Sequence, residues 1–119
     1  MIKYTEDELL SNLWQGSDKG GSIEARKAID LNNLILSCER DKTGITLKKS
    51  LVGLTSNEEQ FSFSFTKYGN DLILSHVKVF GQEQDPIVIS KVELDTVISE
   101  FKADFKSFSN KTKNYTSKM

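Results

Sequence analysis

The stretch from Phe61 to Phe80 constrains the fold most strongly, because it has the pattern of a β-hairpin. Residues 61–66 read Phe-Ser-Phe-Ser-Phe-Thr and alternate apolar and hydroxyl side chains, with the period of a half-buried strand. Residues 72–80 are rich in β-branched and aromatic residues, and Gly69-Asn70 between the two runs tolerates the positive φ angles of a turn. The sequence therefore predicts an antiparallel hairpin against which the rest of the chain packs.

The alternation also predicts the register of the hairpin. The three phenylalanines of the first run share one face, because successive side chains of a strand point to opposite sides. If these phenylalanines pair with apolar residues of the second run, Val79 lies opposite Phe61 and Val77 lies opposite Phe63. This pairing requires a loop of odd length, so we expect three or five residues around Gly69-Asn70, with a bulge. The other face of the second strand then carries Leu72, Leu74 and Phe80.

Capping patterns predict helices near both ends of the chain. Thr5-Glu-Asp-Glu8 is a capping box, and leucines and Trp14 follow at helical spacing, so we expect a helix over residues 6–15. Ser90-Lys-Val-Glu93 is a second capping box, and the apolar residues behind it predict an amphipathic helix over residues 91–108 on the phenylalanine face of the sheet. Those residues recur at steps of three and four, apart from one adjacent pair: Leu94, Val97, Ile98, Phe101, Phe105 and Phe108.

The segment between the first helix and the hairpin allows two interpretations. Ser22 is a good N-cap, and an apolar stripe to Cys38 favours a second helix over residues 23–39. The alternative ends that helix near residue 31 and makes residues 34–39 a strand, which turns at 41–44 into the next strand. Either way we expect a strand over residues 45–51. Polar loops are expected at 55–60 and 81–86, and Pro86 opens a short strand over 87–89.

These elements predict an α+β fold: an antiparallel β-meander of three to five strands, with N-terminal helices and a C-terminal amphipathic helix packed on one face. A chain of 119 residues has the length of one domain, which we expect to span residues 1–108. Residues 109–119 are Ser, Thr, Asn and Lys with few apolar residues, so this basic tail is expected to be disordered.

Charge is unevenly distributed along the chain, although the net charge is only −1. Five lysines and one aspartate make residues 101–119 basic, so the first hundred residues are acidic. An acidic body disfavours nucleic acid as the main partner. Apolar runs are too short to span a membrane, the N-terminus has no apolar leader, and the lone Cys38 suits a reducing compartment. We therefore expect a cytoplasmic protein.

The chain offers little catalytic or metal-binding chemistry. His76 and Cys38 are its only histidine and cysteine, whereas a zinc site needs three or four ligands. His76 lacks an evident partner for acid–base catalysis, and Cys38 lacks the signature of a nucleophile. The glycines of residues 16–21 lack the Lys-Ser/Thr ending of a phosphate-binding loop. We therefore expect no enzyme activity, no metal and no cofactor.

One cluster of charged residues follows from the topology. In an antiparallel meander, the loops before Phe61 and after Phe80 lie at the same end of the sheet. Their acids are therefore expected to form one acidic edge: Glu58, Glu59, Glu83 and Asp85. Surface loops are commonly charged simply because they are solvated. The functional interpretation is a docking surface for a basic protein, which opposite potentials would steer to it.

The order of these elements resembles that of small bacterial immunity proteins, which neutralise toxin domains of contact-dependent inhibition and related polymorphic toxin systems. The resemblance covers the acidic N-terminal region, the Phe-rich meander and the closing ISKVELDTVISEFKADFKSF helix, residues 89–108. It implies a cytoplasmic, non-enzymatic inhibitor that binds one cognate toxin, often a basic nuclease, and occludes its active site. The alternative is a small-ligand-binding or regulatory α+β module, with a pocket between the sheet and the C-terminal helix.

Overall fold

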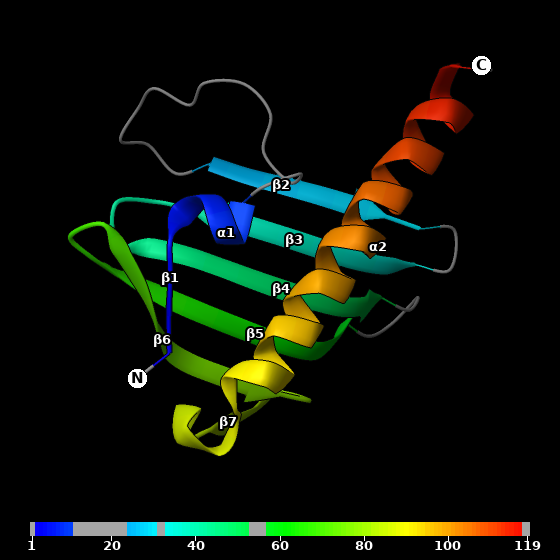
Figure 1. The fold of residues 1–119 in the computed structure, drawn as a ribbon. Coiled ribbons are helices and arrows are strands. Elements are labelled where there is room, and N and C mark those ends of the chain that lie inside the picture. Colours follow the sequence, from blue (N-terminus) through cyan, green and yellow to red (C-terminus); the bar gives the residue numbers. More distant parts are fainter. Residues whose placement is uncertain (1, 11–23, 31–32, 53–56, 118–119) are drawn as a thin grey trace.

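The computed structural model describes residues 2–10, 24–30, 33–52 and 57–117. Within these ranges the chain forms one seven-stranded sheet with helices against one face (Figure 1). The strands are β1 (Lys3–Tyr4), β2 (Glu24–Ile29), β3 (Leu34–Arg40), β4 (Gly44–Val52), β5 (Asn57–Tyr68), β6 (Asp71–Val79) and β7 (Gln82–Gln84). The helical elements are α1 (Glu6–Leu10), the 3-10 helix η1 (Pro86–Val88) and α2 (Lys91–Ser117).

All strand pairs in the sheet are antiparallel, and β2 to β6 follow one another as a meander. The outer edge of β6 is shared by β1, which pairs near Leu72, and β7, which pairs near Lys78. The predicted α+β class and antiparallel meander are therefore confirmed. The predicted number of three to five strands is too low, because β1 and β7 were not recognised and β2 and β3 replace a helix.

The predicted helix over residues 23–39 is wrong, because Glu24–Ile29 and Leu34–Arg40 form the antiparallel strands β2 and β3; residues 23, 31 and 32 lie outside the described residues. Asn33 between the strands has φ 65°, a left-handed conformation that asparagine tolerates and that an α-helix does not contain. The side chain of Asp30 accepts a hydrogen bond from the N–H of Leu34 at 2.9 Å, which tightens the turn. The alternative, a strand over residues 34–39, is confirmed.

The turn between β3 and β4 also follows that alternative. The Asp41 carboxylate accepts hydrogen bonds from the N–H groups of Thr43 at 2.8 Å and Gly44 at 3.1 Å. A side chain that holds the backbone in this way replaces the ladder bonds that a turn lacks. β4 begins directly after it, so the predicted strand over residues 45–51 is confirmed.

The hairpin β5–β6 has the predicted register at its outer end only. Phe61 lies opposite Val79, and pairing continues in that register to Ser64. The connection, however, is a two-residue turn at 69–70, so the predicted odd-length loop is wrong. The extra residue lies within β6 instead, where Ser75 has no partner in β5 and forms a β-bulge.

This bulge decides which side chains of β6 reach the core. The Ser75 hydroxyl donates to the carbonyl of Ser64 at 3.1 Å and accepts from the Thr66 hydroxyl at 2.8 Å, so this side chain links the bulge to β5. Side chains alternate along a regular strand, and one extra residue reverses the alternation. The bulge therefore turns to the helix-covered face three buried residues that a regular strand would divide between two faces: Leu72, Leu74 and Val77.

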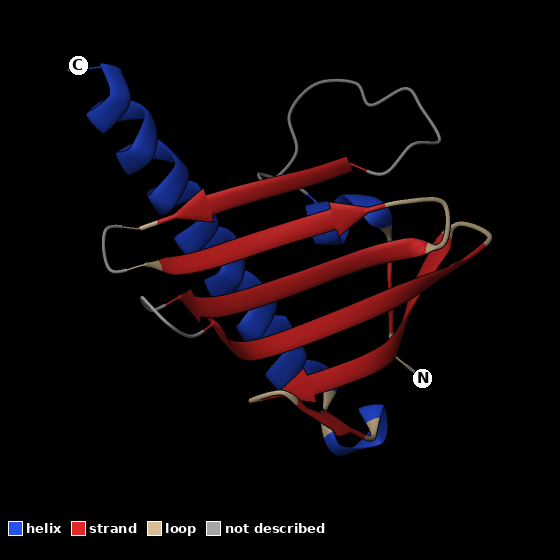
Figure 2. Cartoon of the chain, turned by 180° about the vertical axis from the view of Figure 1, so that it is seen from behind, coloured by secondary structure: helices blue, strands red, loops and turns tan. Residues whose placement is uncertain are grey.

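Helix α2 crosses the sheet diagonally, from the β6–β7 edge to β2 (Figure 1). Its amphipathic pattern is confirmed, because its buried side chains are Leu94, Ile98, Phe101, Phe105 and Phe108. The helix continues to Ser117, past the predicted end at residue 108, so residues 109–117 are helical where a disordered tail was expected. The opposite face of the described sheet has no helix over it (Figure 2).

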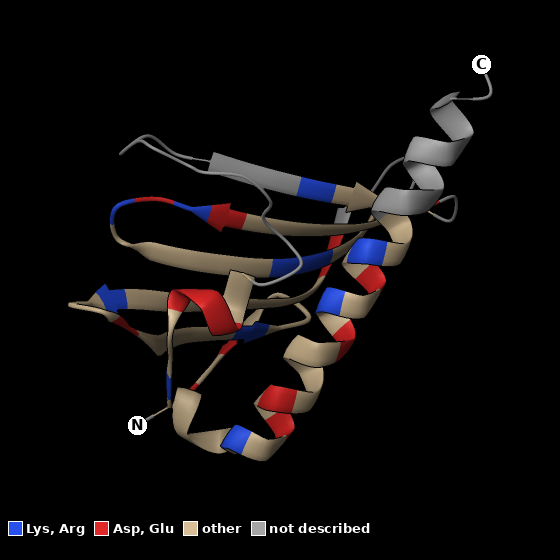
Figure 3. Cartoon of the chain, turned by 45° about the horizontal axis from the view of Figure 1, so that its top comes forward, with Lys and Arg blue, Asp and Glu red and all other residues tan. Residues whose placement is uncertain are grey.

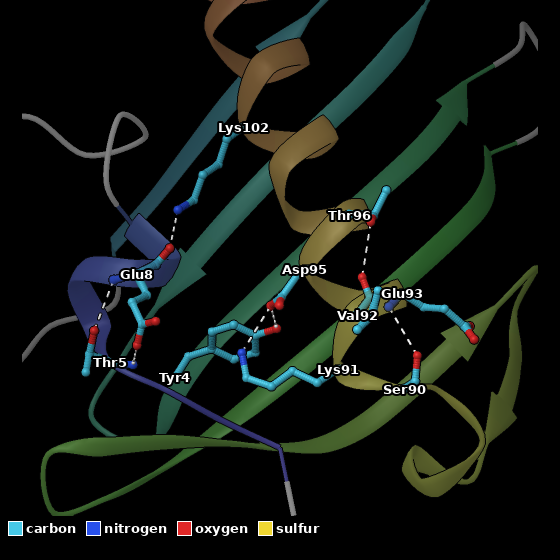
Figure 4. Close-up of polar contacts among 10 residues, drawn as sticks. All are labelled: Tyr4, Thr5, Glu8, Ser90, Lys91, Val92, Glu93, Asp95, Thr96 and Lys102. Carbon is cyan, nitrogen blue, oxygen red and sulfur yellow. Dashed lines mark hydrogen bonds and ion pairs between the residues drawn. The ribbon is translucent and has the colours of Figure 1, made fainter.

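At the N-terminus, α1 begins with the predicted capping box. The N–H of Thr5 donates to the Glu8 carboxylate at 2.8 Å, and the N–H of Glu8 donates to the Thr5 hydroxyl at 3.2 Å (Figure 4). The carbonyl of Glu8 also accepts a hydrogen bond from Lys102 of α2. The predicted helix over residues 6–15 is described as far as Leu10, and its remainder lies outside the described residues.

The N-terminal strand is joined to the first turns of α2 by Tyr4. Its hydroxyl donates to the Asp95 carboxylate at 2.5 Å, and Lys91 lies 3.2 Å from the same carboxylate (Figure 4). The Lys91 ammonium also lies 4.4 Å from the centre of the Tyr4 ring. The Tyr4 hydrogen bond and Lys91 lower the pKa of Asp95, whereas burial and the Asp95 carboxylate raise the pKa of Tyr4.

This contact predicts a loss of stability at both ends of the pH range. The lowered pKa of Asp95 contributes free energy of unfolding in full above the pKa of the unfolded chain, and this contribution is lost as pH falls through the lower pKa of the folded state. The raised pKa of Tyr4 contributes in full at neutral pH, and this contribution is lost as pH rises above about 10. We expect Tyr4→Phe to lower the free energy of unfolding by about 1 kcal/mol at neutral pH and to flatten the alkaline decline. Denaturant unfolding at several pH values measures both effects. Tyr68→Phe, at an exposed tyrosine, is the control, and an alkaline decline that persists unchanged in Tyr4→Phe contradicts the prediction.

Gly44 opens β4 where its backbone lies directly against β5. A Cβ atom at this position would lie 1.8 Å from the carbonyl oxygen of Phe65, so any side chain must force the two strands apart. We expect Gly44→Ala to cost about 3 kcal/mol of unfolding free energy, measured by chemical denaturation. Gly69→Ala is the control, because a Cβ there meets nothing within 4 Å and only φ +64° opposes it, at a cost of about 1 kcal/mol. Equal losses in the two variants would contradict this steric explanation.

Candidate functional site

The four acidic residues predicted to form one edge do not lie together. Glu58 and Glu59 belong to β5, which continues beyond the end of β6 and pairs with β4, so the predicted loop over 55–60 is wrong from residue 57 onward. β7 folds back along β6 and places Glu83 opposite Lys78, which carries it away from Glu58. Strand rise and spacing separate the Cα atoms of Glu58 and Glu83 by about 15 Å.

Each of these acids has a different environment. Glu83 lies on the open face of the sheet and contacts His76, with 3.0 Å between the carboxylate and Nδ1. Asp85 accepts a hydrogen bond from the N–H of Ile87 at 3.0 Å and caps η1, which replaces the strand predicted over residues 87–89. By register, Glu59 shares the open face with Ser50, its partner in β4, whereas Glu58 shares the helix-covered face with Leu51.

An apolar groove lies on the helix-covered face, where the sheet extends beyond α2. Two hollows of about 360 and 510 Å³ adjoin there and share four lining residues: Phe63, Val79, Phe80 and Ile89. The floor is formed by β5 and β6, and one wall is α2. We call this feature the α2 groove and define it by the residues that line the two hollows: Leu36, Lys49, Gln60, Phe61, Phe63, Val77, Val79, Phe80, Gln82, Gln84, Val88, Ile89, Glu93, Val97, Glu100, Phe101 and Asp104.

The α2 wall of the groove is acidic. Glu93, Glu100 and Asp104 recur with Val97 at steps of four, three and four, so they lie along one side of the helix (Figure 3). Among the described residues that line the two hollows, Lys49 is the one basic side chain. The sequence analysis missed this stripe, although its helical spacing was visible, because a charged helix face is usually just solvated.

Phe80 lines both hollows of the groove in a conformation that aromatic residues rarely adopt. Its φ is 51° and that of Gly81 is 78°, so the two residues form the tight turn between β6 and β7. The side chain is 65% exposed, so burial does not compensate the backbone cost of about 1 kcal/mol. Strained residues of this kind gather at ligand-binding and switch regions.

Other apolar side chains near the groove are also exposed. Val88 lines the groove with Phe80 and is 66% exposed, and its neighbour Ile87 is 84% exposed. Val92, in the first turn of α2, is 76% exposed. The exposed apolar side chains that line the groove itself are Val79, Phe80 and Val88. Exposed apolar surface with a polar rim is typical of sites that bind another molecule.

A second, polar hollow of about 410 Å³ lies on the open face of the sheet. Its lining includes Ser62, Ser64, Lys48 and the His76–Glu83 pair. His76 thus lies on the opposite side of the sheet from α2, so the pocket expected by the ligand-binding alternative, between sheet and helix, does not contain it. The hydroxyl of Ser64 contacts that of Thr46 at 3.3 Å.

Cys38 has no catalytic environment. It is fully buried in β3, where burial raises the pKa of its thiol to about 12. A thiol with such a pKa is a poor nucleophile at neutral pH and acts as a small apolar residue of the core. In the part of the chain that the structure describes, no three His, Cys, Asp or Glu side chains gather as a metal site.

Comparison of the chain with protein-family models, curated proteins and solved structures found no match. Among the helices of the described ranges, none is both long and apolar enough to cross a membrane. The surface geometry is therefore what points to a function.

The turn at Phe80 offers a direct stability test. Asparagine followed by glycine is the preferred pair for a two-residue turn with two positive φ angles. We expect Phe80→Asn to raise the free energy of unfolding by about 0.5–1 kcal/mol, because it relieves strain at a side chain that is largely exposed. Thermal and denaturant unfolding measure the change. A marked loss of stability would show that the Phe80 side chain serves the fold.

Proposed function

We propose that this chain is an immunity-type inhibitor that binds the toxin domain of a polymorphic toxin system and occludes its active site. The observation that carries the proposal is the α2 groove, with an apolar floor beside an acidic wall. An apolar centre with a charged rim is the usual anatomy of a protein–protein interface. The acidic wall favours a basic partner, such as a nuclease toxin that itself binds nucleic acid.

The four acids predicted to form one edge lie at different positions relative to the α2 groove: Glu58, Glu59, Glu83 and Asp85. Glu58 shares the helix-covered face with the groove floor, so it extends the acidic rim past Phe61. Glu59 and Glu83 face the other side of the sheet, and Asp85 is engaged in capping η1. These three contribute mainly to the long-range potential that attracts a basic protein, which affects the rate of association more than the bound state.

The rigid elements around the groove favour tight binding by an inhibitor. The floor strands β5 and β6 carry the aromatic cluster of the sheet, where the rings of Phe61 and Phe63 lie 4.9 Å apart and those of Phe61 and Phe101 lie 6.3 Å apart. These contacts join the floor to the α2 wall. A surface that is ordered before binding loses little conformational entropy in the complex.

Co-expression tests the proposal. We expect the chain to co-purify with the C-terminal domain of the protein that the adjacent gene encodes. We also expect it to abolish the growth inhibition that this domain causes. The double change Glu100→Lys with Asp104→Lys should weaken the complex by at least about tenfold, through lost attraction and added repulsion. Binding is measured by calorimetry at about 0.1 M and about 0.5 M salt, and higher salt should weaken the unmodified complex.

Glu59→Lys with Glu83→Lys is the matched control, because it makes the same double charge reversal on the open face. It should change affinity far less than the α2 changes. Absence of any complex with the neighbouring domain would rule out the proposed function. A larger effect from the Glu59/Glu83 pair than from the α2 pair would place the interface on the open face of the sheet.

A further inference from the structure

We infer that the α2 groove docks a single short segment of the partner, with apolar side chains flanked by Lys or Arg, and that Phe80 is the anchor of this contact. The inference deepens the proposed function and rests on it for the identity of the partner. The groove selects the chemistry of the segment through its dimensions, its charges and the turn at Phe80.

The dimensions of the groove suit a chain segment. The acidic wall runs along α2 from Glu93 to Asp104, which corresponds to about 16 Å at the rise of a helix. That length accommodates about five residues of an extended segment or three turns of a helix. The hollows of about 360 and 510 Å³ lie side by side beneath it, so they take apolar side chains at two successive places.

The charges of the groove specify the flanks of the segment. Three carboxylates, Glu93, Glu100 and Asp104, face a floor of phenylalanine and valine side chains, with Lys49 as the one cation among the described lining residues. An acidic or neutral segment would leave this wall without counter-charges. Lys or Arg on one side of the segment pairs with the wall while its apolar side chains cover the floor.

Phe80 stands where the two hollows meet, since it lines both of them. Interfaces commonly concentrate their binding energy in a few central aromatic residues, which lose little side-chain entropy on burial. Phe80 is largely exposed, and its backbone conformation opposes an aromatic residue. A segment seated across both hollows would bury it on two sides, which supplies the contact that the free protein lacks.

Synthetic peptides test the inference without the toxin. The probes are a 14-residue amphipathic peptide of Leu and Lys and its counterpart of Leu and Glu, each titrated into the isotope-labelled full chain. We expect the Leu/Lys peptide to shift the amide signals of Val79, Phe80, Val97 and Asp104. We expect Phe80→Asn, and separately Glu100→Lys with Asp104→Lys, to weaken its binding by at least about tenfold. Tyr68→Asn, which removes an exposed aromatic residue elsewhere on β5, should leave it unchanged.

Three results would overturn the inference. The first is equal binding of the Leu/Lys and Leu/Glu peptides, and the second is peptide-induced shifts on the open face around His76. The third is self-association of the chain that shifts the same groove signals on concentration, because the groove is then covered by a second copy of the chain. Sedimentation over a range of concentrations measures this directly.

The peptide titration and the toxin co-expression can fail independently of each other, so the docking site and the immunity function are tested separately. If the Leu/Lys peptide binds the groove but the neighbouring toxin domain forms no complex, the docking site stands and the immunity function fails. If the toxin complex keeps its full affinity in Phe80→Asn and in the α2 charge reversal, the immunity function stands and the docking site fails. Phe80→Asn is informative in both experiments because its fold is expected to be at least as stable as the original.

Discussion

The bulge at Ser75 is the constraint on which the rest of the sheet depends. It allows one strand to present Leu72 and Leu74 near the turn, and Val77 and Val79 near the outer end, to the same helix-covered face. Without the extra residue, one of these pairs would face solvent and the core would lose half of that strand. The Ser75 hydroxyl bonds the Ser64 carbonyl and the Thr66 hydroxyl, which holds the bulge against β5. The groove floor at Val79 is therefore a consequence of the same hydroxyl contacts that complete the core.

Local patterns predicted the elements whose contacts are local. The capping box at Thr5, the N-cap at Ser90 and the apolar stripe of α2 are all read within a few residues, and each is present. The second hydrogen bond of the box predicted at Ser90, from its N–H to Glu93, is not among the contacts of the described residues. The predicted pairing of Phe61 with Val79 needs one residue more than a two-residue turn provides, and this extra residue is present. The pairing alone does not say whether the extra residue lies in the turn or in a strand. The helix predicted over residues 23–39 is wrong for a related reason. Their apolar spacing fits a helical stripe as well as it fits strands, and the pairing of Ala28 with Leu36 that decides between them is a tertiary contact.

The candidate site was harder to predict because it depends on how elements cross. The prediction of an acidic edge assumed that the segments flanking the hairpin project in one direction. Instead, β5 continues past Phe61 and β7 folds back beside β6. The stripe of Glu93, Glu100 and Asp104 is readable in the sequence, but most charged helix faces are only solvated. What distinguishes this one is the apolar floor beside it. That floor is visible only once the diagonal path of α2 over the sheet is known (Figure 1).

The same diagonal path accounts for why the groove exists at all. A helix aligned with the strands would cover the sheet evenly, whereas α2 leaves the corner formed by Phe61 and Val79 beside it and extends past β2 at its other end. The core is complete without that corner, since the sheet and the buried face of α2 already enclose Phe63 and Phe101. The side chain of Phe80 is largely exposed although its backbone is strained. A residue that breaks a local rule in this way is expected where a second molecule makes the compensating contacts.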